Sequence, residues 1–158
     1  PERAARVAPP ASGPYATIER RLITLCLLQP EAFRQEYDSL SRLPWRDDPA
    51  LLLFQLMEYR AGTGGSWQAE EITASDDLPA EIAAIFRGSI LSESTTAEAS
   101  PETAVLEIQE LCLKHELALL SEDLGRLKKD ALEERFDLIK RVKALEEELR
   151  LPAYKRGN

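Results

Sequence analysis

Hydrophobic residues recur at helical intervals along most of the chain. A wide apolar stripe predicts a first helix over 17–28, because residues three and four apart share one helix face. Its members are Ile18, Leu22, Leu25 and Leu28. Gln29 precedes Pro30, so this helix should end there, since the residue before proline disfavours the helical conformation. Pro30 then suits the start of a second, short helix over 31–37.

Asp47-Asp48-Pro49 predicts the start of the next helix. Asp48 is the expected N-cap, because its carboxylate can accept orphan backbone N–H groups, and Pro49 suits the first turn. This helix should stop at Gly62. The residues before it, Leu40, Leu43 and Trp45, are expected to form a packed connection.

Two shorter helices are expected between the middle of the chain and residue 100. Ser66 can cap one that runs through Ile72, and Asp77 with Pro79 introduces another that runs through Ile90. Between 61 and 100 the chain carries seven acidic residues and one basic residue, Arg87. We interpret them as a solvated face rather than an acidic docking surface.

A leucine-rich segment follows Ser100, which is the expected N-cap, with Pro101 at the first helical position. Its leucines step by sevens, fours and threes, as in a coiled-coil seam. These are Leu106, Leu113, Leu117, Leu120, Leu124 and Leu127, and a second seam comprises Leu138, Val142, Leu145 and Leu149. Asp130 and Glu133 fit a capping box between the two seams. The pattern predicts antiparallel helices over 101–128 and 131–149 with a tight turn.

One rival geometry stays open, because no glycine or proline interrupts 127–132. A single helix over 101–149 would be roughly 70 Å long at about 1.5 Å per residue. It would leave its leucines exposed unless another chain covered them.

The predicted fold class is therefore all-α, with an N-terminal multi-helix bundle followed by a C-terminal helical hairpin or one long helix that can straighten. Residues 1–16 are rich in proline and are expected to be a disordered linker. The bundle should span 17–100, the long helix and hairpin 101–150, and a tail 151–158. Because the chain begins with Pro1 and its only methionine is Met57, we expect a piece of a longer protein.

Composition narrows the classes of function. The net charge of −8 argues against binding a nucleic-acid backbone, which needs clustered positive charge. The sequence contains neither an apolar run of about 18 residues nor a signal-peptide pattern, so we expect a cytoplasmic protein. Cys26 and Cys112 are interpreted as two reduced core thiols.

Catalytic and metal-binding patterns are absent from the sequence. His115 is the only histidine, so neither a Ser-His-Asp set nor a Cys-His zinc site can be assembled credibly. The glycine-rich stretch 62–65 is not followed by Gly-Lys-Ser/Thr, which excludes a phosphate loop of that kind. We expect no catalytic residues, no cofactor and no metal in this chain.

The remaining candidate for a functional site is a surface for a partner protein near the turn predicted between the two leucine seams. The stretch 126–143 has seven basic and four acidic residues, so it is locally basic with a net charge of +3 (seven minus four). Phe136 and Ile139 lie near the turn, where they could either close the hairpin internally or anchor a partner. A helix face with apolar anchors and a charged rim is typical of a protein interface.

Several strings resemble the C-terminal helicase-binding domain of bacterial DnaG-type primase. One is 20–31 (RRLITLCLLQPE), an apolar helix that runs into Pro-Glu, and another is 51–57 (LLLFQLM). The third is the terminal pair of seams, with 133–136 (EERF) leading to 145–149 (LEEEL). Their order and spacing carry the resemblance over about residues 17–150.

The resemblance implies a helical bundle whose terminal hairpin docks on the N-terminal domains of the hexameric DnaB-type replicative helicase. It implies that the domain recruits the primer-synthesising enzyme to the replication fork and modulates helicase activity. Zinc and magnesium would belong to catalytic domains of the full-length primase that this chain lacks. Single-stranded-DNA-binding protein is a further implied partner, through Arg20. The helicase-binding residues that we expect are Leu132, Arg135, Phe136, Ile139, Lys140, Arg141 and Lys143.

Two other classes of protein fit the same pattern. One is the N-terminal domain of the replicative helicase itself, which would be followed by an ATPase domain and would form rings. The other is a coiled-coil dimerisation module, whereas the primase interpretation predicts a monomer in isolation.

Overall fold

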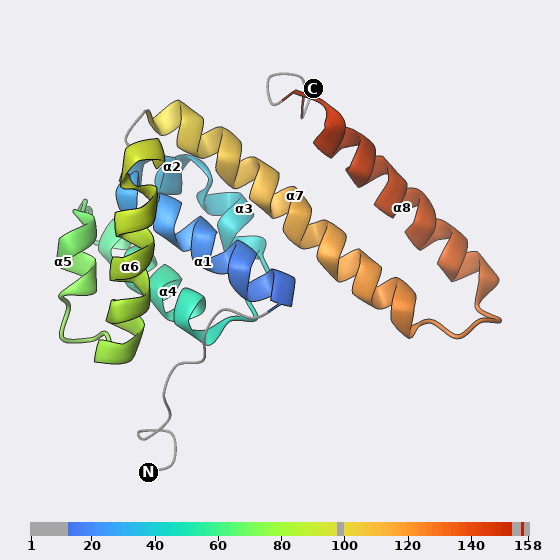
Figure 1. The fold of residues 1–158 in the computed structure, drawn as a ribbon, viewed down its shortest axis with the longest axis horizontal. Coiled ribbons are helices and arrows are strands. Elements are labelled where there is room, and N and C mark those ends of the chain that lie inside the picture. Colours follow the sequence, from blue (N-terminus) through green and yellow to red (C-terminus); the bar gives the residue numbers. More distant parts are fainter. Residues whose placement is uncertain (1–12, 98–99, 153–155, 157–158) are drawn as a thin grey trace, which may run out of the picture. The chain divides into compact units, whose positions relative to one another are not determined.

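The computed structural model describes residues 13–97, 100–152 and 156, with side chains for 13–92, 100–152 and 156 (Figure 1). Eight helices make up the secondary structure of this described part, which confirms the all-α prediction. They are α1 (Gly13–Leu28), α2 (Pro30–Gln35), α3 (Tyr37–Arg42), α4 (Asp48–Gly62), α5 (Ala69–Thr73), α6 (Ala80–Ala97), α7 (Pro101–Arg126) and α8 (Leu132–Arg150). Residues 1–12 of the predicted linker 1–16 lie outside the described residues. Residues 13–16 belong to α1, so the linker prediction is wrong for these four residues.

The chain divides into two compact units, Pro1–Ile108 and Gln109–Asn158. The division falls inside α7, so the first two turns of this helix belong to the first unit. Ala104 and Ile108 are buried there. Nη2 of Arg21 on α1 donates to Oε2 of Glu107 on α7 at 2.6 Å.

Helix α1 forms the centre of the first unit. Its second half is buried on nearly all sides, from Leu22 to Leu27. A helix that is apolar around its whole circumference requires neighbours on several sides. Helices α2, α4 and α6 supply them, and α5 packs on α6.

Aromatic rings fill the space between α2, α3 and α4. Phe33 is fully buried and lies 5.8 Å from Phe54 and 5.4 Å from Trp67, measured between ring centroids. Trp45 stacks on Phe54 at 5.2 Å. Tyr37 of α3 stacks on Phe54 at 6.2 Å, and Leu40 of α3 is fully buried. The first part of the packed connection that we predicted around Leu40, Leu43 and Trp45 is therefore helical.

Two predicted N-caps are wrong. The N-cap of α4 is Asp47, whose Oδ2 accepts the backbone N–H of Ala50 at 3.2 Å, and Asp48 is the first helical residue. Helix α5 begins after Gln68, not after Ser66, because Glu71 accepts the Gln68 N–H at 3.2 Å. The turn between α4 and α5 contains Gly64 at φ 81°, in the left-handed region that glycine tolerates.

The predicted start of α7 is confirmed. Ser100 Oγ accepts the backbone N–H of Thr103 at 3.1 Å, and Pro101 occupies the first helical position, where its missing N–H costs nothing. No helix within the described ranges is long and apolar enough to cross a bilayer.

Candidate functional site

In the second unit, α7 and α8 form a hairpin, and the rival single helix is wrong. Helix α7 ends at Arg126 and α8 begins at Leu132, with the N–H of Ala131 donating to the carbonyl of Lys128 at 3.0 Å in the turn. The predicted Asp130–Glu133 capping box is also wrong. The N-cap residue of α8 is Ala131, which has no side chain that could accept a hydrogen bond.

Three arginines tie the two helices together along their length. Arg135 Nη1 donates to the carbonyl of Leu124 at 3.4 Å near the turn. Arg141 Nη2 donates to Oε2 of Glu116 at 2.6 Å farther along. Arg156, beyond the end of α8, donates to Oε1 of Glu110 at 3.1 Å. The three pairs fix an antiparallel register, which Figure 1 shows in the course of the two helices.

Two large apolar side chains remain exposed at the first turn of α8. Leu132 is 66% exposed and Phe136 is 65% exposed. They lie four residues apart, so their side chains share one helix face. Phe136 therefore does not close the hairpin internally, which was one of the two possibilities for it, whereas Ile139 is half-buried. The apolar pair forms the candidate partner surface, which we call the hairpin tip (Leu132 and Phe136).

The remaining four predicted partner-binding residues take different positions. Lys140 and Lys143 are exposed on α8, where they can contribute positive charge to the rim. Arg135 is half-buried against α7. Arg141 is exposed, but its guanidinium binds Glu116 on α7 of the same hairpin. Substituting Arg141 would therefore disturb the hairpin as well as any interface.

Arg20, the implied contact for single-stranded-DNA-binding protein, is buried. Its side chain is 7% exposed, and Nε and Nη2 bind Oδ2 and Oδ1 of Asp47 at 2.8 and 3.0 Å. No local pattern indicated this pair, because its members are 27 residues apart. The guanidinium of Arg20 is committed to the interior of the bundle.

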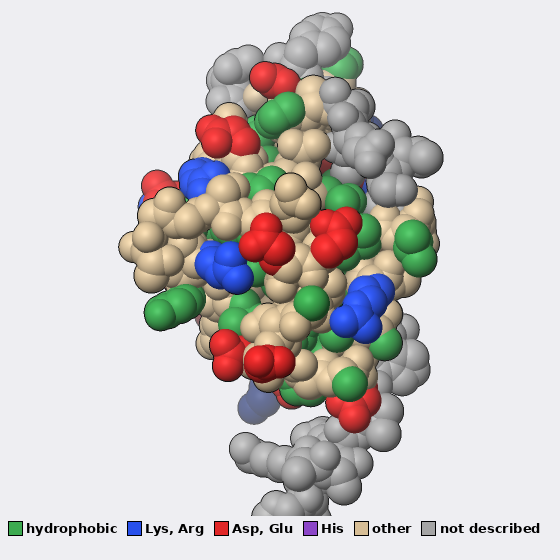
Figure 2. Space-filling model, turned by 90° about the vertical axis from the view of Figure 1, so that its left-hand side faces the viewer, with side chains coloured by type: hydrophobic (Ala, Val, Ile, Leu, Met, Phe, Trp, Pro, Cys, Tyr) green, Lys and Arg blue, Asp and Glu red, His purple; other side chains and the backbone are tan. Residues whose placement is uncertain are grey.

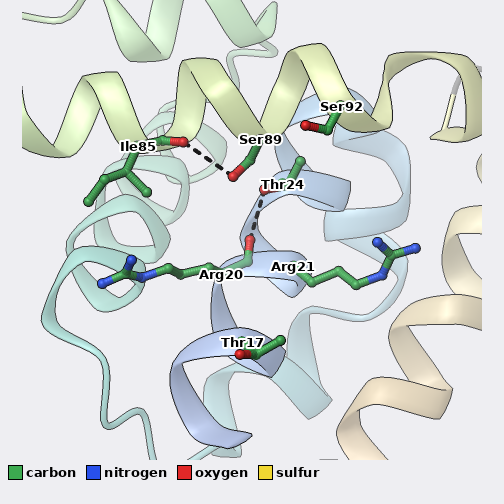
Figure 3. A pocket seen from close by; sticks show the side chains of 7 residues that line it. All are labelled: Thr17, Arg20, Arg21, Thr24, Ile85, Ser89 and Ser92. Carbon is green, nitrogen blue, oxygen red and sulfur yellow. Dashed lines mark hydrogen bonds between the residues drawn. The ribbon is translucent and has the colours of Figure 1, made fainter. Parts of the chain in front are cut away.

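A hollow of about 320 Å³ lies beside Arg20 between α1 and α6 (Figure 3). The guanidinium groups of Arg20 and Arg21 extend in opposite directions, and Arg21 binds Glu107. The hydroxyls of Thr24 and Ser89 donate to carbonyls of their own helices at 2.8 and 3.2 Å. The cationic groups of this hollow are thus already paired with carboxylates.

A second hollow, of about 510 Å³, lies between α2, α3 and the end of α4. Phe33 and Tyr37 line it, and the hydroxyl of Tyr37 donates to Oε2 of Glu58. This hydrogen bond raises the pKa of Tyr37 above its usual value of 10.0, because it stabilises the neutral phenol, and burial and the nearby negative charge act in the same direction.

The acidic segment beyond residue 61 behaves as a solvated face. Five of its acidic side chains are exposed: Glu70, Glu71, Asp76, Asp77 and Glu81. Glu93 and Glu98 lie outside the described side chains. Figure 2 views the molecule from the side of α5 and α6 and shows acidic side chains spread among polar and apolar ones. No single acidic patch forms on the face in view.

The remaining chemical candidates give no site. His115 is buried on α7, Cys26 is buried on α1 and Cys112 is half-buried, with neither thiol in a disulfide. Within 13–97, 100–152 and 156, no cluster of three or more His, Cys, Asp or Glu side chains could hold a metal ion.

Comparisons with protein-family models, with curated proteins and with solved structures found no match to this chain.

Proposed function

We propose that this chain is the helicase-interaction domain of a bacterial DnaG-type DNA primase. In this proposal, the chain recruits the primer-synthesising enzyme to the replicative helicase at the fork and modulates the helicase. The observation that carries the proposal is the hairpin tip, where Leu132 and Phe136 are exposed together beside a basic turn. Exposed apolar anchors within a charged rim are the features that dominate protein interfaces.

The arrangement of the chain supports the same proposal. A helical bundle precedes a terminal hairpin, in the order that the resemblance implies. Lys128 and Lys129 in the turn are exposed, as are Lys140 and Lys143 on α8. Exposed Asp130, Glu133, Glu134 and Asp137 lie among these lysines, so the rim carries both charges. It favours an apolar groove on the helicase N-terminal domains whose borders also carry both charges, because complementary charge speeds association.

Recruitment, not chemistry, is the proposed mechanism. Binding to the helicase raises the local concentration of the primase active site beside newly exposed template strand, as tethering does generally. The zinc and magnesium of primer synthesis belong, in this proposal, to domains upstream of the chain. The site of action is the cytoplasmic replisome.

Gel filtration of the full chain with a hexameric DnaB-type helicase tests the proposal. We expect the chain to elute with the helicase hexamer and to elute as a monomer when it is alone. Elution apart from the helicase at micromolar concentrations of both proteins would contradict the proposal. A stable dimer of the isolated chain would favour the coiled-coil interpretation instead.

Single-stranded-DNA-binding protein remains a secondary proposed partner. Because Arg20 is buried against Asp47, a contact with the acidic tail of that protein would have to use other residues or open the Arg20–Asp47 pair. Titration of the full chain with a peptide of that tail measures the contact directly.

A further inference from the structure

The side chain of Arg156 spans the open end of the hairpin, opposite the turn. Its Nε donates to the carbonyl of Glu148 at 3.2 Å. Its Nη2 donates to the carbonyl of Leu149 at 2.9 Å and to Oε1 of Glu110 at 3.1 Å. The side chain is only 12% exposed. One guanidinium thus binds the end of α8 and the facing part of α7 at the same time.

The end of α8 offers a suitable place for a cation. The last carbonyls of a helix have no N–H partner within it and carry a partial negative charge. Helix α8 ends at Arg150 because Leu151 is extended and Pro152 follows. Arg156 approaches this helix end with a planar set of donors, which can serve two carbonyls and one carboxylate in a way that a lysine cannot.

The apolar packing of α8 is thin. Of its residues, all of which the structure describes, Leu145 alone is buried. Leu138, Val142 and Leu149 are half-buried. A helix with little buried apolar surface depends more on its polar contacts, and its end opens at a low free-energy cost.

The contacts that Arg141 and Arg135 make between the helices are weaker than those of Arg156. The Arg141–Glu116 pair is exposed, with side chains 56% and 38% accessible, and exposed ion pairs contribute little. The Arg135–Leu124 hydrogen bond is long, at 3.4 Å. Arg156 makes three contacts, and its side chain is 12% exposed, against 56% for Arg141.

We propose that Arg156 is a clasp that holds the end of α8 against α7, and that losing it lets this end of the hairpin separate. The clasp belongs to the chain itself and does not depend on which partner the hairpin tip binds. It makes Arg156 a control point for hairpin closure, although Arg156 lies at the opposite end of the hairpin from the tip.

Amide hydrogen exchange of the full chain tests the clasp. We expect Arg156→Ala to raise the exchange rates of amides 143–150 by about fivefold or more, because three hydrogen bonds to charged groups or helix-end carbonyls are lost. The matched control is Arg150→Ala, which removes the same charge from an exposed position on α8. Equal rates in the two variants would overturn the proposal.

A second pair of variants separates a clasp from a simple helix cap. Glu110→Ala alters α7 alone, but a clasp predicts that the amides of 143–150 in α8 exchange faster in this variant. Glu102→Ala, at an exposed position on α7, is the control. If Glu110→Ala left α8 unchanged, Arg156 would only cap α8 and the clasp would be wrong. Circular dichroism checks that each variant stays helical.

Discussion

Arg20 and Asp47 form a buried, two-pronged ion pair that joins α1 to the first turn of α4. Asp47 also accepts the Ala50 N–H as the N-cap of α4. The neighbouring Glu19 is fully buried and accepts the backbone N–H groups of Arg46 and Asp47 at 2.9 and 2.8 Å. Two consecutive residues of α1 therefore hold the start of α4 in place.

Removing Asp47 should destabilise the bundle severely. Asp47→Ala leaves the guanidinium of Arg20 buried without its carboxylate, and breaking one side of a buried pair costs about 3–5 kcal/mol. Urea denaturation measures the free energy of unfolding. Asp48→Ala is the control, because Asp48 is exposed and its charge at the helix start is worth at most about 1 kcal/mol. Equal losses in both variants would contradict the assignment of Asp47 as the cap.

Two serine-to-alanine changes should alter stability in opposite directions. Ser100→Ala removes the cap hydroxyl of α7 and should lower the free energy of unfolding by about 1 kcal/mol. Ser92→Ala should raise it by a few tenths, because alanine has the higher helix propensity and the Ser92 hydroxyl only bonds the Gly88 carbonyl of its own helix. Thermal denaturation of the two variants checks the signs.

Tyr37 should make stability fall at alkaline pH. Its folded pKa is raised above the usual 10.0, mainly by the hydrogen bond to Glu58. The neutral phenol is thus favoured by folding, so this contribution is complete below about pH 10 and is lost as pH rises through the folded pKa. Tyr37→Phe should flatten the decline, and Tyr59→Phe, at a 72% exposed position, should not. Urea midpoints between about pH 9 and 11 measure the difference.

Local patterns predicted the helices well where the decisive residues are neighbours in sequence. Ser100-Pro101 predicted the start of α7, because capping acts within a few residues. The leucine spacing predicted two helical seams but left a single helix over 101–149 open, and the structure decides for the hairpin. Neighbouring choices were harder: Asp47 and Asp48 are both good caps, and only the contact with Arg20 distinguishes them.

Long-range contacts could not be predicted in the same way. Arg20 pairs with a residue 27 positions away, so its sequence context resembles that of any surface arginine. Arg156 contacts Glu110 across 46 positions, from a segment that looks like a tail. The exposure of Phe136 was one of two open possibilities, because the leucine spacing does not determine whether side chains near the turn pack against the other helix.

The most direct test of the proposed function is the affinity of the hairpin tip for the helicase. Leu132→Ser combined with Phe136→Ser should weaken binding to a hexameric DnaB-type helicase at least about tenfold, because truncating buried anchors costs 1–2 kcal/mol or more each. Tyr59→Ser, at an exposed position on α4, is the matched control and should bind as the unaltered chain does. Calorimetric titration of each chain into the helicase measures these affinities. If the double variant stayed helical and bound as tightly as the control, the hairpin tip would not be the binding surface.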